Sequence, residues 1–269
     1  MGMKQLRKLG LMVAVSVLLN SASQTRSEEP LPKVEEIIKR AVKRADNEAQ
    51  NDIDFKKKYY FVRSKLTEIR NFEGELKKSD SRINTNSPQK IVEAPKPVEP
   101  EPDKDVVVVR SPKDEQFSSS KMGKATARKF DKNQFQFNDD LVARYDFKLI
   151  GREMTNGYSL LVVDFAPKKK KLPENGIRDR LINRVAGRIW VDEREYAIRS
   201  CKLTLLESVS IVGGIVGEAQ KFDYSFDRER TEDGIWYVAD SKWRLEGRQV
   251  VVYRKAEYHE TRTQVKKVE

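Results

Sequence analysis

The chain has one cysteine, Cys201, and one histidine, His259. A single cysteine cannot form an intramolecular disulfide, and a structural zinc site usually needs about four side-chain ligands. Cys201 lies in an alternating segment, which predicts a small buried residue, whereas a reactive thiol would need exposure and a cationic neighbour. The chain also lacks a Gly-x-Ser-x-Gly motif that could supply His259 with a nucleophile. We therefore expect a non-enzymatic protein without a metal or a cofactor.

No apolar run is as long as the roughly 20 residues of an ordinary membrane-spanning helix. The longest one, residues 9–19 (LGLMVAVSVLL), follows Lys4, Arg7 and Lys8 and precedes the small residues 21–23. This arrangement is typical of a cleavable signal peptide, so residues 1–23 are predicted to be removed; an uncleaved anchor is the alternative. No cysteine stands directly after the run, so a lipoprotein-type lipid anchor is not expected. Export without disulfides fits a periplasmic protein.

Acidic residues are the minority among charged residues, with 42 Asp and Glu against 53 Lys and Arg and a net charge of +11. The excess of positive charge favours contact with anionic surfaces such as phospholipid or lipopolysaccharide headgroups. Nucleic acid is the usual partner of a basic chain, but an exported protein seldom meets it, so none is expected. The loop residues Lys168, Lys169, Lys170 and Lys171 are candidates for headgroup contact, and a solvated loop is the alternative.

Residues 24–269 are predicted to form one α+β domain. Apolar positions at helical spacing predict a helix over Pro32–Phe55 with one stripe that packs on a sheet. A mostly polar hairpin is expected over residues 57–82. The stretch of about 84–133 is rich in proline and poor in apolar residues, so it is predicted to be a flexible insertion.

The second half of the chain alternates between apolar and polar residues with a period of two, which predicts antiparallel strands. The clearest hairpin joins Gly187–Asp192 to Tyr196–Leu203, and the Asn156-Gly157 turn precedes the apolar strand Tyr158–Phe165. A short helix is expected over Ile177–Val185. Further strands are expected over residues 218–228, 235–246 and 248–264, with turns at residues 233–234 and at 247.

A large antiparallel sheet with one apolar face must cover that face, and few helices are available to do so. The sheet is therefore either filled by its side chains or left with a hollow. The candidate lipid-contact residues are the apolar positions of the strands and of a glycine-rich connection: Leu161, Val163, Phe165, Ile189, Val191, Ile211, Val212, Ile215, Phe222, Tyr224, Phe226, Tyr237 and Trp243. The connection, Ile211–Val216, is predicted to be either a flap over the hollow or a segment buried under the sheet edge.

Several of these segments resemble the bacterial outer-membrane lipoprotein-sorting proteins, which have the LolA/LolB-like fold. The matching segments are YDFKLIGRE (Tyr145–Glu153), the Asn156-Gly157 turn, GRIWVD (Gly187–Asp192), the Gly213-Gly214 loop and DGIWY (Asp233–Tyr237). The resemblance extends over most of residues 34–267 apart from the insertion. It implies an incomplete β-barrel, a strongly curved antiparallel sheet with helices on its apolar concave face. In characterised members the hollow receives lipid acyl chains.

The sequence thus predicts a monomeric, soluble periplasmic carrier or chaperone that shelters acyl chains of lipids or lipoproteins in a half-barrel cavity. A cell-envelope scaffold that binds a protein partner is the alternative. An enzyme that depends on His259 ranks third.

Overall fold

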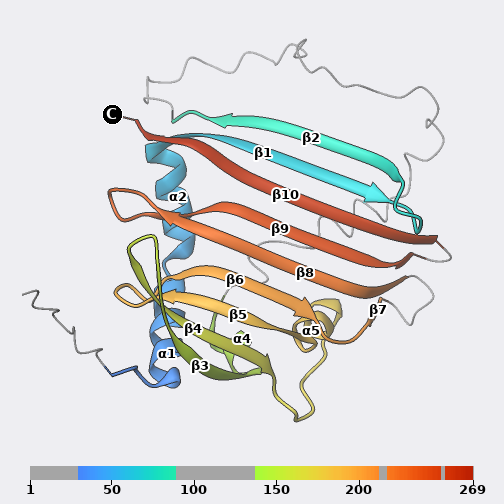
Figure 1. Ribbon diagram of the computed structural model, residues 1–269, viewed down its shortest axis with the longest axis horizontal. Coiled ribbons are helices and arrows are strands. Elements are labelled where there is room, and N and C mark those ends of the chain that lie inside the picture. Colours follow the sequence, from blue (N-terminus) through green and yellow to red (C-terminus); the bar gives the residue numbers. More distant parts are fainter. Residues whose placement is uncertain (1–29, 89–136, 212–216, 250–251, 269) are drawn as a thin grey trace, which may run out of the picture. The chain divides into compact units, whose positions relative to one another are not determined.

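The computed structural model describes residues 30–88, 137–211, 217–249 and 252–268. The predicted signal peptide and residues 89–133 of the predicted insertion lie outside these ranges, as do Val212 and Ile215. From Leu31 onward the chain forms one compact unit, and most of its described part is a single antiparallel sheet of ten strands (Figure 1). The predicted α+β class is confirmed.

The strand order is β2-β1-β10-β9-β8-β6-β5-β4-β3, and β7 pairs with β8 off this path. Because β2 and β3 end the order without pairing to each other, the sheet is an incomplete barrel, as predicted. The hairpin of β1 and β2 joins the sheet through the C-terminal strand. The strands are β1 Tyr59–Arg70, β2 Leu76–Asn86, β3 Tyr145–Thr155, β4 Tyr158–Pro167, β5 Val185–Asp192, β6 Ile198–Leu205, β7 Val209–Ile211, β8 Gly217–Arg230, β9 Trp236–Gln249 and β10 Val252–Lys267.

Two glycines show where turn prediction succeeded and where it failed. Asn156 and Gly157 both have positive φ, 50° and 78°, as expected for the hairpin turn between β3 and β4. The predicted turn at Gly247 is wrong, because this residue lies inside β9 and pairs with Ala219 of β8. A Cβ atom at Gly247 would lie 2.1 Å from the carbonyl oxygen of Glu218. The position needs glycine because β8 passes close to it.

The single predicted N-terminal helix is two helices, α1 (Val34–Ala45) and α2 (Glu48–Lys58). The break lets each helix pack on a different part of the sheet. Two short helices complete the described part, α4 (Asp139–Val142) and α5 (Ile177–Ile182). In Figure 1, α1 and α2 cross the strands near one end of the sheet.

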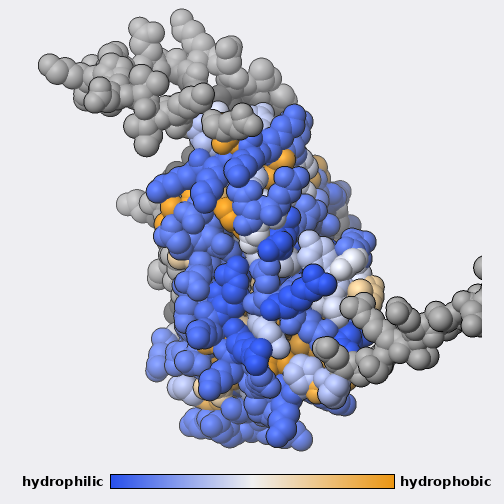
Figure 2. All heavy atoms as spheres, turned by 90° about the vertical axis from the view of Figure 1, so that its left-hand side faces the viewer, coloured by the Kyte–Doolittle hydropathy of each residue, from blue (hydrophilic) through white to orange (hydrophobic). Residues whose placement is uncertain are grey.

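The largest core cluster lies between α1 and strands β4, β5 and β6. Its buried members are Ile37, Ile38, Ala41, Leu161, Val163, Ile189, Val191 and Cys201. The opposite face of α1 carries exposed charges, and Figure 2 shows a mostly hydrophilic surface on this side of the molecule. Cys201 is buried as predicted, and burial raises the pKa of its thiol to about 12.

A second cluster fixes α2 to the other half of the sheet. The Phe55 ring stacks on Tyr237 of β9 with centroids 4.4 Å apart, and Tyr59 and Phe61 of β1 pack beside it. Arg228 of β8 binds Glu48 of α2, with Nη1 2.9 Å from Oε1. This cluster explains the position of α2, because Phe55 is its one buried residue.

Candidate functional site

The sheet has two chemically different faces. Side chains of successive strand residues point to opposite faces. The inner face, which packs on α1, carries Leu161, Val163 and Ile189. The outer face carries residues of the other parity, such as Asp164 and Arg188, which lie opposite each other in the register of β4 and β5.

A row of large apolar side chains crosses the inner face. Cross-strand register aligns its members at one level of the sheet. The row lies two residues beyond the positions of β4 and β5 that α1 buries, and each of its side chains is partly exposed. We call it the inner row; it consists of Phe147, Phe165, Leu203, Tyr224, Trp243 and Tyr258.

The predicted lipid-contact residues divide into several groups. Phe165, Tyr224 and Trp243 belong to the inner row. The others lie elsewhere: Leu161, Val163, Ile189 and Val191 are in the core under α1, Tyr237 is beside Phe55, Phe226 packs on the main core, and Phe222 is partly exposed on β8. Ile211 pairs with Gly217 through its backbone, and Val212 and Ile215 lie outside the described residues. Apart from Ile211, the predicted flap thus lies outside the described residues.

The predicted basic loop joins β4 to α5. Lys168 donates from Nζ to the carbonyl oxygen of Ala143 at 2.9 Å, so its position is fixed by the chain itself. Lys169, Lys170 and Lys171 are exposed. The loop thus presents three ammonium groups to solvent.

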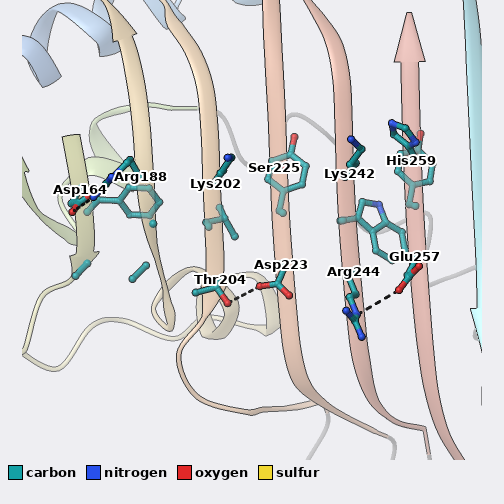
Figure 3. Close-up of a pocket in the computed structure, with 18 of the residues that line it drawn as sticks. Asp164, Arg188, Lys202, Thr204, Asp223, Ser225, Lys242, Arg244, Glu257 and His259 are labelled. Carbon is teal, nitrogen blue, oxygen red and sulfur yellow. Dashed lines mark hydrogen bonds and ion pairs between the residues drawn. The ribbon is translucent and has the colours of Figure 1, made fainter. Parts of the chain in front are cut away.

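The inner face contains a groove with a volume of about 1150 Å³ and a mostly apolar lining. All six residues of the inner row line it, so their side chains form its floor. The residues that flank the row along eight strands border the groove through their backbone, because their side chains point to the outer face. We call this feature the inner groove, and Figure 3 shows residues along it.

Two rows of side chains on the outer face, behind the inner groove, carry opposite charge. The basic row has Lys148, Arg188, Lys202 and Lys242 with a single acid, Asp164. The acidic row has Glu68, Asp146, Asp223 and Glu257 with a single cation, Arg244. Figure 3 shows several of these groups paired with one another.

Pairing between these outer-face side chains offsets part of the charge separation. The Arg188 guanidinium contacts Asp164 at 2.5 Å, and this hydrogen bond holds the pKa of the carboxyl below its usual range. Thr204 donates to Asp223 at 2.7 Å, and Nε of Arg244 lies 3.5 Å from Glu257. The outer face behind the groove is therefore polar and partly self-compensated, whereas the lining of the inner groove is mostly apolar.

Where β1 meets β10, the inner face changes from apolar to basic. Arg63 binds Glu260 with both forks of its guanidinium, at 2.8 and 2.7 Å, and Arg262 lies 3.5 Å from the same carboxylate. Lys65 is the cross-strand neighbour of Glu260. We call Arg63, Lys65 and Arg262 the basic cluster. The Tyr258 hydroxyl donates to Glu260 and so connects the inner row to the cluster.

Sequence reasoning missed the basic cluster and half of the inner row, namely Phe147, Leu203 and Tyr258. Alternation identified the strands, but the pairing of β1 with β10 joins residues 197 apart in the sequence. No local signal announces such a pairing.

Among the described residues, no group of three or more His, Cys, Asp or Glu side chains is placed to hold a metal ion. His259 Nε2 lies 2.6 Å from Asp240 Oδ2 on the outer face. No helix in the described ranges has the length and apolar character needed to cross a membrane.

Comparison with known proteins gives structural neighbours only. No known family profile matches the chain, and no curated protein matches it. An outer membrane lipoprotein-sorting protein domain from Vibrio parahaemolyticus is similar, with 11% identity, coverage of 86% of this chain and 93% of that chain, and a TM-score of 0.33. A DUF1329 family protein from Desulfovibrio piger has 15% identity, coverage of 86% and 92%, and a TM-score of 0.30.

A third similar structure is the MucA/MucB complex of Pseudomonas aeruginosa, with 10% identity, coverage of 82% of this chain and 94% of that chain, and a TM-score of 0.20. One of the three carries the name of the family that the sequence resembles. The TM-scores are low, so the fold rests on the strand order and helix positions described above.

Proposed function

We propose that the chain is a periplasmic carrier that shelters acyl chains of lipids or lipoproteins against the inner face of its sheet. The inner row is the observation that carries this proposal. It places six large apolar side chains, all partly exposed, on the face where α1 already forms a core. Burying an acyl chain there would contribute about 0.8 kcal/mol per CH₂ group.

The arrangement of the helices supports the same function. α1 packs on Leu161, Val163, Ile189 and Val191, so this end of the inner face is filled. Beyond it, Phe147, Phe165 and Leu203 are only partly covered. An acyl chain would extend the core that α1 begins, with α1 as a fixed boundary.

The proposed location rests on the N-terminal sequence. The short apolar run after three basic residues favours export to the periplasm. Catalysis is not part of the proposal, because acyl sheltering needs only apolar surface.

Native mass spectrometry can test the proposal. Protein purified from the periplasm without detergent should carry lipid, and delipidated protein should bind it again. Leu203→Asn places an amide in the inner row and should lower lipid occupancy. Thr204→Asn, its neighbour on the outer face, is the matched control and should not. Protein that never carries lipid, or equal occupancy in both variants, would contradict acyl sheltering at this row.

A non-enzymatic cell-envelope scaffold that binds a protein partner is the second candidate, and the two charged rows of the outer face favour it. A photo-crosslinking residue at Ser225, in line with the basic row, should then give one defined product in the native host. Lys202→Glu reverses an exposed charge of the basic row and should weaken that product. Crosslinking that is diffuse, or unaffected by Lys202→Glu, would count against this candidate.

A further inference from the structure

We propose that the basic cluster binds the phosphate of an anionic lipid headgroup while the acyl chains of that lipid lie along the inner row. This inference rests on the proposed carrier function and assigns its ligand class. The cluster consists of Arg63, Lys65 and Arg262, which all lie on the inner face.

The first argument is a charge imbalance. Arg63 and Arg262 are direct cross-strand partners, so two like charges face each other. Glu260, whose side chain is 3% exposed, contacts both guanidinium groups. Asp52 of α2 acts on Arg262 only through its longer-range field. Within the described part of the chain, three cations thus surround one contacting carboxylate, which leaves positive charge that an anion would neutralise.

Neighbouring charges do not remove this imbalance. Arg82 of β2 is the cross-strand partner of Lys65 and adds a further cation. It is paired with Asp80 at 2.9 Å, so this pair is close to neutral as a unit. The field of Arg82 still acts on Lys65 and lowers the pKa of its ammonium, after the larger effects of burial and of Arg63.

The second argument is unused hydrogen-bonding capacity. The Arg262 side chain is 6% exposed, yet its Nε finds no hydrogen-bond partner among the described residues. Burial lowers the pKa of Arg262, which reflects the cost of holding its charge away from water. Lys65 forms no ion pair with any described residue. A phosphate offers several acceptor oxygens and matches the fork geometry of a guanidinium.

The third argument is continuity with the apolar surface. The Tyr258 ring stacks on Trp243, and its hydroxyl donates to Glu260 within the cluster. Thr67 pairs with Tyr258, and Lys65, two residues earlier on β1, pairs with Glu260. An amphipathic ligand could therefore place its chains on the aromatic rings and its phosphate at the cluster without crossing a polar gap.

Two short-chain probes separate the headgroup from the chains. Dioctanoyl phosphatidic acid carries the phosphate, whereas dioctanoylglycerol has the same chains without it. By calorimetry, wild-type protein should bind phosphatidic acid more tightly. Lys65→Gln should weaken phosphatidic acid binding about tenfold and leave dioctanoylglycerol unchanged, because one charge-assisted contact is lost. Lys65→Arg should restore most of the affinity.

Lys148→Gln removes an equal charge from the outer face and should change neither affinity. Inorganic phosphate is the third probe and should bind far more weakly than phosphatidic acid. Equal, Lys65-dependent binding of inorganic phosphate would overturn the lipid assignment. If Lys65→Gln left the affinity for phosphatidic acid unchanged, the headgroup site would be wrong. The carrier function would still hold in that case, provided that the protein binds dioctanoylglycerol. Failure to bind either lipid would contradict the carrier function itself.

Discussion

The indole of Trp243 stacks on the ring of Tyr258 with centroids 5.6 Å apart and planes 11° apart. The two residues are direct partners in the register of β9 and β10. Their contact lies where the inner row meets the basic cluster, since the Tyr258 hydroxyl donates to Glu260. The ring of Tyr258 therefore belongs to the apolar inner row, while its hydroxyl hydrogen-bonds within the basic cluster.

Tyr258→Phe should separate these two roles. The ring stack would remain, so binding of dioctanoylglycerol should stay unchanged. Glu260 would lose one donor, and the free energy of unfolding should fall by about 1 kcal/mol. Chemical denaturation and calorimetry measure the two effects. Tyr258→Ala is the comparison and should also weaken dioctanoylglycerol binding; equal binding by both variants would remove Tyr258 from the acyl surface.

Leu161 should behave as a core residue. Its side chain is fully buried beneath α1, so Leu161→Ala leaves a cavity and should lower the free energy of unfolding by about 2–5 kcal/mol. Ile150→Ala, at a position 46% exposed on β3, should cost less than about 1 kcal/mol. Urea denaturation of both variants tests the pair. A Leu161 variant of wild-type stability that loses lipid binding would instead place Leu161 in the site.

Gly247 and Gly151 give a test of the strand assignment. Gly247→Ala would force a Cβ to within 2.1 Å of the Glu218 carbonyl and should destabilise the protein by about 1–3 kcal/mol. Gly151→Ala meets no atom within 4 Å and should change stability by about 0.5 kcal/mol or less. Thermal unfolding of the two variants checks this. A neutral Gly247→Ala would favour the turn that the sequence suggested.

The ion pair of Arg152 and Glu193 should contribute to acid sensitivity. Arg152 donates to Glu193 at 2.8 Å, and this hydrogen bond is the main cause that lowers the carboxyl pKa. The pKa of Glu193 is lower in the folded than in the unfolded protein, so its ion pair stabilises the fold at pH values above the unfolded pKa. This stabilisation is lost as the pH falls through the folded pKa. Glu193→Gln should therefore reduce stability at pH 7 and much less at pH 3.

Glu207→Gln is the control for this titration. Glu207 is exposed, and its substitution should change the free energy of unfolding at pH 7 by about 0.5 kcal/mol or less. If the free energy of unfolding changed with pH in the same way for Glu193→Gln and wild type, the Arg152 contact would contribute nothing to acid stability.

Local sequence signals were sufficient for most strands and turns. The alternation in GRIWVD predicted β5, and Asn156-Gly157 predicted the turn before β4, because both signals lie within a few neighbouring residues. The break between α1 and α2 could not be predicted from the local sequence. It depends on the contact of Phe55 with Tyr237, which is far away in the sequence.

The candidate site depended more on tertiary contacts. Alternation places Leu161 and Phe165 on the same face, but only the position of α1 decides that Leu161 is buried and Phe165 is partly exposed. The local sequence around Arg63 and around Arg262 does not predict that the two residues are cross-strand partners. The inner groove and the charged rows behind it likewise form only when eight strands are in register.

Quenching of tryptophan fluorescence by dibromostearate tests the central claim most directly, because bromine quenches only an indole that it approaches closely. Trp243 is on the inner row, Trp190 is on the outer face, where its Nε1 lies 3.0 Å from Glu153, and Trp236 is fully buried. If acyl chains lie on the inner row, dibromostearate should quench wild type and Trp190→Phe alike, and Trp243→Phe should lose most of the quenching. Quenching that survives Trp243→Phe and disappears in Trp190→Phe would place the chain on the outer face and contradict the account.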